Sequence, residues 1–264
     1  MLKIVCMKWG TKFPPAYVNV LHAAVLRHMQ QPFEFICFCD NGDGLDKRIT
    51  ILPLPGLGLP PEKMSKGGWQ KLAMFKRGLF KPDDLIMVLD VDIMITGPLD
   101  PFIERAKAMG GLHILREWVA WPFKPFRKML NYKQHGQSSV FIFKPADQYH
   151  LLEDFVADPQ AAYDKASNDQ KYISWFATQP HYLPESWTCS FKRHCLRLGP
   201  HNGIWPGVRQ PTGINIVVFH GYPHPDDLVR DDNKRWGKRD KWGHGAVAWV
   251  KDYWEQGLRE TQLQ

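Results

Sequence analysis

Residues 85–89 form an uninterrupted apolar stretch, LIMVL, that runs directly into Asp90 and then Asp92. Successive side chains of a strand point to opposite faces, so a run of this kind predicts a strand buried on both faces. Such strands occupy the centre of sheets that helices cover on both sides. Two carboxylates at the end of the run would repel each other unless a cation lies between them. The stretch therefore predicts an α/β sheet with a charged site at the end of a central strand.

Apolar runs and amphipathic segments alternate along the rest of the chain. We expect strands at 2–7, 33–39, 49–55, 83–92, 138–145 and 213–221. We expect helices at 14–28, 68–80, 98–111, 146–158 and 161–178. The β-α-β start predicts a mixed, mostly parallel central sheet flanked by helices. The simplest division is a main domain at 1–228 and a basic, Trp-rich, helical extension at 229–264.

The composition limits the partners and the location. The formal charge of +7 suits phosphate-bearing ligands, nucleic acid or an anionic membrane surface. No nucleic-acid-binding motif accompanies the basic residues, so we expect no nucleic-acid partner. The five cysteines lack metal-type spacing and suit a reducing compartment. We find neither a signal peptide nor a membrane-spanning stretch, so we expect a cytoplasmic protein.

The motif Asp-x-Asp after an apolar strand is typical of two enzyme groups. In aspartyl-nucleophile phosphatases the motif reads D-x-D-x-T near the start of the chain. Here its fifth position is Met94, and the motif lies a third of the way along the sequence. In nucleotide-sugar glycosyltransferases about a hundred residues of β-α-β type precede the motif, as they do here. A third possibility is a non-catalytic sugar-binding protein that keeps such a fold.

Four separated segments resemble retaining glycosyltransferases of family 8, which have the GT-A fold. They are LIMVLDVDIMITGPLDPF at 85–102, QSSVFIFKP at 137–145, SNDQKYISW at 167–175 and VVFHGYPHPDDL at 217–228. Their order and spacing together carry the resemblance. It implies transfer of a sugar, with retention, from a nucleoside-diphosphate sugar, expected to be UDP-linked. The implied acceptor is a saccharide or a lipid-linked glycan.

The resemblance also implies a metal site and a sugar site. Asp90, Asp92 and His220 would bind Mn²⁺ or Mg²⁺ on the donor diphosphate, and two aspartates with one histidine suit Mn²⁺. Asp169 and Gln170 match a pair that lies beside the sugar in the family, and they are the expected catalytic residues. Without these roles, His220 would be a histidine at the core edge, and Asp169 or its neighbour would cap a surface helix.

Further residues are expected to contact the nucleotide sugar. Gly10 would let the backbone approach the ligand, Trp9 could stack on a base, and Asp40 could accept hydrogen bonds from the base or ribose. The whole expected set is Met7, Lys8, Trp9, Gly10, Asp40, Lys71, Asp90, Val91, Asp92, Ser138, His220, Gly221 and His224. Two family positions differ, because His224 replaces a phosphate-binding lysine and Gln137-Ser138-Ser139 replaces Asn-Ser-Gly. The second of these departures alters the pocket near the sugar and the acceptor.

The C-terminal extension combines Lys and Arg with Trp236, Trp242, Trp249 and Trp254. Basic residues beside tryptophan suit the surface of a membrane, where the indole ring lies at the level of the headgroups. The alternative, favoured slightly because aspartates dilute the positive charge, is that these tryptophans pack against the domain. Peripheral contact with the inner face of a membrane thus stays one of two expectations.

Overall fold

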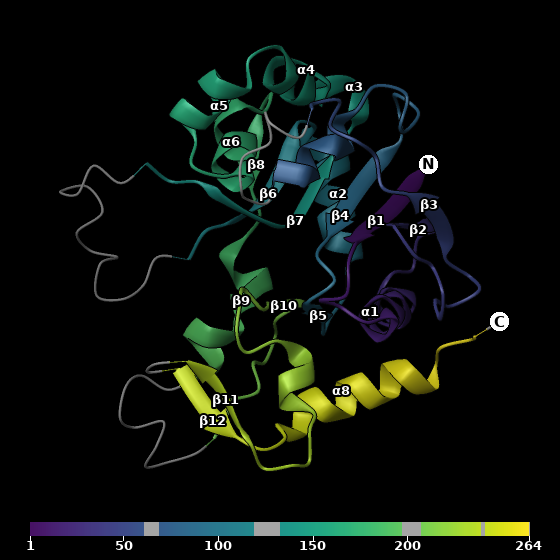
Figure 1. Ribbon diagram of the computed structural model, residues 1–264, viewed down its shortest axis with the longest axis vertical. Coiled ribbons are helices and arrows are strands. Elements are labelled where there is room, and N and C mark those ends of the chain that lie inside the picture. Colours follow the sequence, from purple (N-terminus) through teal and green to yellow (C-terminus); the bar gives the residue numbers. More distant parts are fainter. Residues whose placement is uncertain (61–68, 119–132, 197–206, 239–240, 264) are drawn as a thin grey trace.

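The computed structural model describes residues 1–60, 69–118, 133–196, 207–238 and 241–263. Its centre is a seven-stranded sheet with the strand order β3-β2-β1-β4-β7-β6-β8 (Figure 1). The strands are β1 (Leu2–Lys8), β2 (Glu34–Cys39), β3 (Thr50–Pro53), β4 (Leu85–Leu89), β6 (Leu112–Arg116), β7 (Gly136–Phe143) and β8 (Pro180–Tyr182). Only β7 runs against its neighbours in this sheet. The predicted mixed, mostly parallel sheet flanked by helices is confirmed.

Helices cover both faces of the sheet, and the strand residues alternate between two cores. In β1, Ile4 and Cys6 face one core, whereas Val5 and Met7 face the other. The first core contains α1 (Pro15–His28) and α2 (Asp100–Met109). The second contains the 3₁₀ segment η2 (Trp69–Phe75), α4 (His150–Ala157), α5 (Pro159–Lys165) and α6 (Asp169–Phe176), with α3 (Pro145–Gln148) leading into α4. All five residues of β4 are buried, as the opening run predicts.

Smaller elements complete the fold. A three-stranded sheet has the order β5-β10-β9 and contains β5 (Ile93–Ile95), β9 (Thr188–Ser190) and β10 (Ile216–Val218). The 3₁₀ turn η4 (Glu185–Trp187) precedes β9, the π-helical turn η5 (Phe191–Cys195) follows it, and the 3₁₀ turn η6 (Pro225–Leu228) follows β10. The hairpin β11 (Arg235–Lys238)–β12 (Lys241–His244) and α8 (Ala248–Arg259) end the chain.

Some predicted boundaries are wrong for local reasons. The helix expected at 161–178 is two helices, because Asn168 caps α6 by accepting a hydrogen bond from Lys171 N at 3.0 Å. The helix expected at 68–80 is a 3₁₀ segment over Trp69–Phe75, and Gly68 lies outside the described residues. The late strand is shorter than expected, and β5, β6, β8 and β9 were not anticipated. These strands are short, or lack the alternation that marks a strand in the sequence.

The C-terminal extension packs on the first helix. Figure 1 shows α8 in yellow running beside α1 in purple. Trp254 is buried and makes an edge contact with Tyr17, the ring centroids lying 4.8 Å apart. Trp236 is also buried and donates a hydrogen bond to Gly245 O at 2.8 Å. For these two tryptophans the structure favours packing against the domain, whereas Trp242 and Trp249 stay half-buried.

The five cysteines are buried and free, as the sequence suggests. No helix in the described part of the chain has both the length and the apolar character needed to cross a membrane.

Two buried histidines make stability depend on pH. Burial lowers the pKa of His22 and of His113 to about 4, and within the described residues Nδ1 of each ring lacks a hydrogen-bond partner. Below pH 6.5 the unfolded chain binds protons that these folded-state rings exclude. We therefore expect the free energy of unfolding to fall between pH 6.5 and 4, by roughly 1.4 kcal/mol per pH unit for each group. Urea unfolding at several pH values measures this. His113→Gln should reduce the slope, and an unchanged slope would contradict the assignment.

Candidate functional site

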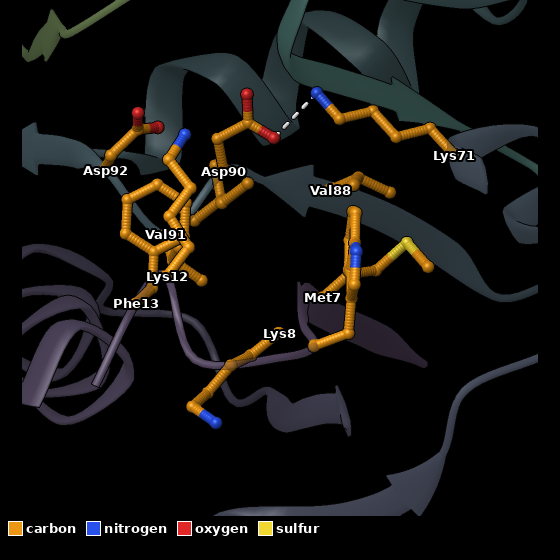
Figure 2. Close-up of a pocket in the computed structure, with 11 residues that line it drawn as sticks. Met7, Lys8, Lys12, Phe13, Lys71, Val88, Asp90, Val91 and Asp92 are labelled. Carbon is orange, nitrogen blue, oxygen red and sulfur yellow. Dashed lines mark ion pairs between the residues drawn. The ribbon is translucent and has the colours of Figure 1, made fainter. Parts of the chain in front are cut away.

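The two aspartates follow the central strand, as expected, but they lie in the turn between β4 and β5 and not in a strand that continues to residue 92. Asp90 N donates to Ser139 O at 2.9 Å, which extends the pairing of β4 with β7 by one residue. Both aspartates line a cavity of about 280 Å³ at the end of the central strands (Figure 2). Ligand sites of open α/β sheets are expected at such strand ends. The other residues lining the cavity are Met7, Lys8, Trp9, Lys12, Phe13, Lys71, Val88, Leu89 and Val91.

Asp90 is held by a cation and a hydroxyl. Its Oδ1 lies 2.7 Å from Lys71 Nζ, the ion pair drawn in Figure 2, and its Oδ2 accepts from Ser139 Oγ at 2.7 Å. Lys71 also donates to Ser138 O at 3.0 Å. Burial alone would lower the pKa of Lys71, but Asp90 and Asp169 outweigh it, so the pKa is raised. The positive charge of Lys71 therefore stabilises the charged forms of the nearby carboxylates, those of Asp90, Asp169 and Asp92.

Asp92 is more deeply buried and has a different neighbour. Only 9% of the residue is exposed, and His224 Nδ1 lies 3.4 Å from its Oδ2. Burial raises the pKa of Asp92, and Asp90 adds to the rise, while His224 opposes it. A carboxylate in this position is costly to ionise without further positive charge. The expectation that two adjacent aspartates need a cation therefore applies most strongly to Asp92.

The start of α6 brings the predicted catalytic pair to β7. Ser138 Oγ donates to Asp169 Oδ2 at 2.9 Å, and Ser138 N donates to Gln170 Oε1 at 3.2 Å. Because Lys71 also donates to Ser138, these residues form one network with Asp90. Burial raises the pKa of Asp169, although Lys71 and Ser138 favour its charged form. Residues from four separate parts of the sequence are thus connected beside the cavity.

The loop after β1 forms the opposite wall. Trp9 is 48% exposed, whereas Lys8 is buried. Gly10 has φ +61°, which favours glycine, and its N donates to Asp40 Oδ2 at 2.7 Å. This bond lowers the pKa of Asp40. Lys8, Gly10 and Asp40 also line a neighbouring cavity of about 470 Å³. Asp40, which directly follows β2, is thus hydrogen-bonded to the loop after β1.

His220 has other partners. Its Nε2 is 2.6 Å from Ser190 Oγ, and its ring stacks with Trp118 at 6.2 Å between centroids. Burial lowers its pKa to about 4, and Lys192 and Arg193 add to the effect. Over the described ranges, no three His, Cys, Asp or Glu side chains are grouped so as to hold a metal ion. Asp90, Asp92 and His220 are therefore not brought together as a ready-made ligand set. Gly221, beside His220, is exposed.

Comparisons with known proteins give structural matches only. Neither a protein-family model nor a curated protein sequence matches the chain. The galactosyltransferase LgtC, in complex with donor and acceptor sugar analogs, superposes with a TM-score of 0.61 at 13% identity, over 99% of this chain and 97% of that chain. The chain has the GT-A glycosyltransferase fold.

Two further structures share the GT-A fold of this chain. An active-site mutant of LgtC, with glutamine replaced by glutamate, gives a TM-score of 0.62 at 12% identity, over 99% of this chain and 97% of that chain. Mouse xyloside xylosyltransferase 1 in its apo form gives 0.51 at 15% identity, over 83% of this chain and 96% of that chain. At these identities the likeness concerns the fold alone.

Several residues of this GT-A site were not anticipated from the sequence. Ser139 holds Asp90, and Gln137 Nε2 donates to Ser139 Oγ at 2.6 Å. Lys12 and Phe13 also line the cavity; they belong to the loop 7–13 that was expected to face the nucleotide, although residues 7–10 alone were named as contacts. His224 was expected at the phosphate but contacts Asp92. The departure at Gln137 was visible in the sequence, whereas nothing local to His224 indicates its neighbour.

Proposed function

We propose that this protein is a metal-dependent glycosyltransferase. It would transfer a sugar from a nucleoside-diphosphate sugar, UDP-linked in our expectation, to a saccharide or lipid-linked glycan. A single observation carries the proposal: one cavity is lined by the loop after β1, by Lys71 and by both aspartates, and the Ser138–Asp169–Gln170 network adjoins it. An aromatic ring, cations and carboxylates around one cavity suit a ligand with a base, a diphosphate and a sugar.

The residues on the β1 side suit the nucleotide. Exposed Trp9 offers a ring face for a base, and Lys8 and Lys12 offer positive charge to the phosphates. Asp40 is an acceptor for base or ribose hydroxyl groups. The carboxylates of Asp90 and Asp92 are ligands of the type that Mn²⁺ and Mg²⁺ prefer. Burial raises the pKa of Asp92, so a bound cation would stabilise its charged form. A bound divalent cation would neutralise the charge that develops on the departing nucleoside diphosphate.

The residues on the β7 side suit the sugar. Asp169 is 5% exposed and held by Ser138, so its carboxylate has a defined position for contacts to sugar hydroxyl groups. Gln170 is the next residue of α6, and a glutamine is the residue replaced in the LgtC active-site mutant. We assign Asp169 and Gln170 to positioning the sugar and supporting its oxocarbenium-like transition state. Retention is expected because the resembling family retains configuration.

A panel of nucleotide sugars tests the function without an acceptor. Each donor is incubated with the protein and Mn²⁺, or with EDTA, and released nucleoside diphosphate is measured. We expect hydrolysis of at least one donor with Mn²⁺ and none with EDTA. Binding without turnover across donors and acceptors would indicate a non-catalytic sugar-binding protein. Phosphate release from aryl phosphates that is lost in Asp90→Asn would indicate the phosphatase instead.

A further inference from the structure

We propose that Lys192 and Lys238 form an anion site that binds the diphosphate of the donor. The inference rests on the proposed function, because it names residues that would contact the phosphates of the same ligand. The site consists of side chains of this chain alone and does not depend on a bound metal ion.

The small sheet brings Lys192 to the edge at which Asp92 lies. In the order β5-β10-β9, Ile93 pairs with Val218, and Val218 pairs with Ser190 (Figure 1). Asp92 directly precedes Ile93, whereas η5, which contains Lys192, directly follows Ser190. Because β5 runs antiparallel to β10 and β9 runs parallel to it, the start of β5 and the end of β9 lie at one edge of this sheet.

The ammonium groups of both lysines lie beside Gly221, where no side chain fills the space. Gly221 is exposed, and a Cβ built at this position would lie 3.4 Å from Lys192 Nζ. Lys192 Nζ donates to His220 O at 2.5 Å. Lys238 Nζ lies 4.9 Å from the ring centre of Tyr222, which is 51% exposed. Both cations therefore border an open stretch of backbone that a ligand can approach.

The positive charges near Lys192 repel one another. Burial lowers the pKa of Lys192, and Arg193 and Lys238 add to the effect, whereas Asp92 opposes it. Arg193 has a carboxylate partner, because its Nη2 lies 3.8 Å from Glu117 Oε1. Within the described residues, no such ion pair joins Lys192 or Lys238 to a carboxylate. An anion held by these two lysines would offset the repulsion and accept charge-assisted hydrogen bonds.

The position beside Asp92 favours the donor diphosphate as this anion. Asp92 lines the cavity proposed for the nucleotide sugar, whose volume of about 280 Å³ lies below the roughly 300–1,000 Å³ of typical small-molecule sites. A nucleotide sugar would therefore extend beyond the cavity. Extension past Asp92 leads to Lys192, since both lie at one edge of the small sheet. The diphosphate is the most highly charged part of such a ligand, so it is the part that two lysines would bind.

Calorimetric titration with UDP and with uridine tests the site without measuring activity, in Mn²⁺ and again in EDTA. We expect Lys192→Met to weaken UDP binding by at least about tenfold and uridine binding by less than about twofold. Lys192→Arg keeps the charge and should recover most of the UDP affinity.

The matched control for Lys192→Met is Lys107→Met. Lys107 Nζ also donates to a single oxygen, Gln31 Oε1, at 2.5 Å. It lies in the last turn of α2, before the start of β6, and thus at the edge of the large sheet opposite to the cavity. Lys107→Met should leave both affinities unchanged. Equal UDP affinities of the two methionine variants would overturn the inference and leave the proposed function intact.

A second variant covers the case in which Lys192→Met does not fold. Lys238 is exposed, so Lys238→Met should fold and should weaken UDP binding by about threefold. An unchanged UDP affinity in Lys238→Met would overturn the site of two lysines.

Titration with inorganic pyrophosphate separates the inference from the proposed function. If the wild type binds pyrophosphate but not UDP, and Lys192→Met or Lys238→Met loses this binding, the anion site is supported and the UDP-linked donor is contradicted. If the wild type binds neither ligand, the inference is overturned, and the donor panel decides the function separately.

Discussion

Asp92→Asn should reduce Mn²⁺-dependent donor hydrolysis by roughly 10²–10³-fold while leaving the metal-free protein at least as stable as the wild type. The activity is expected to fall because the amide removes a negative ligand from the proposed cation site. Stability is maintained because Asp92 is buried, with a raised pKa, and its ionised form is costly beside Asp90. Asparagine has the same shape without the charge. Donor hydrolysis and thermal unfolding in EDTA measure the two effects.

The matched control for this variant is Asp100→Asn. Asp100 lies at the start of α2, where its carboxylate accepts from Gln30 N at 3.0 Å. The same chemical change there should leave donor hydrolysis unchanged and cost a little stability. A nucleotide sugar should raise the melting temperature of Asp100→Asn in Mn²⁺ but not that of Asp92→Asn. Equal ligand-induced shifts in both variants would contradict a metal role for Asp92.

Trp69→Ala should destabilise the protein by about 3–5 kcal/mol, because its indole is the centre of an aromatic cluster. Trp69 is 4% exposed and stacks on Phe155 with 5.1 Å between centroids. It also contacts Tyr163 at 5.0 Å and Tyr172 at 5.7 Å. These rings come from α4, α5 and α6, so the cluster joins the segment of Lys71 to the helix that begins with Asp169. We expect urea unfolding to show the loss, with reduced donor hydrolysis in the folded fraction.

Two variants separate packing from ligand contact. Trp69→Phe keeps a ring in the cluster and should recover most of the stability. Trp9→Ala removes an indole that is 48% exposed, so the free energy of unfolding should change by less than about 0.5 kcal/mol. Trp9→Ala should instead weaken nucleotide-sugar binding, measured by calorimetry. A large loss of stability in Trp9→Ala, or none in Trp69→Ala, would contradict these assignments.

Much of the central sheet was predictable because it is built from local patterns. The runs in β1, β2, β4 and β7 are apolar over consecutive residues, which reports burial on both faces. The short strands β5, β8 and β9 carry three residues each and no recognisable period. Their pairing depends on neighbours that the chain supplies from elsewhere, so the sequence alone does not identify them.

In the candidate site, too, some residues could be predicted from the sequence and others could not. Asp90 and Asp92 stand out because charge interrupts an apolar run, and Asp169 and Gln170 stand out through a resemblance. The sequence indicated less about the side chains that contact these residues. Ser139 was noted as part of a departure, yet its hydroxyl holds Asp90. His220 and His224 lie four residues apart, and both are plausible ligands by type.

The sequence by itself determined the central strand, the sheet class and the position of two carboxylates at a strand end. The tertiary structure alone decided that Lys71 pairs with Asp90 and that His224 lies beside Asp92. The physical reason is the range of the forces involved. The spacing of apolar residues along the chain indicates which side chains are buried. A contact of 3.4 Å between two side chains instead depends on the path of a distant loop and on the orientation of one ring.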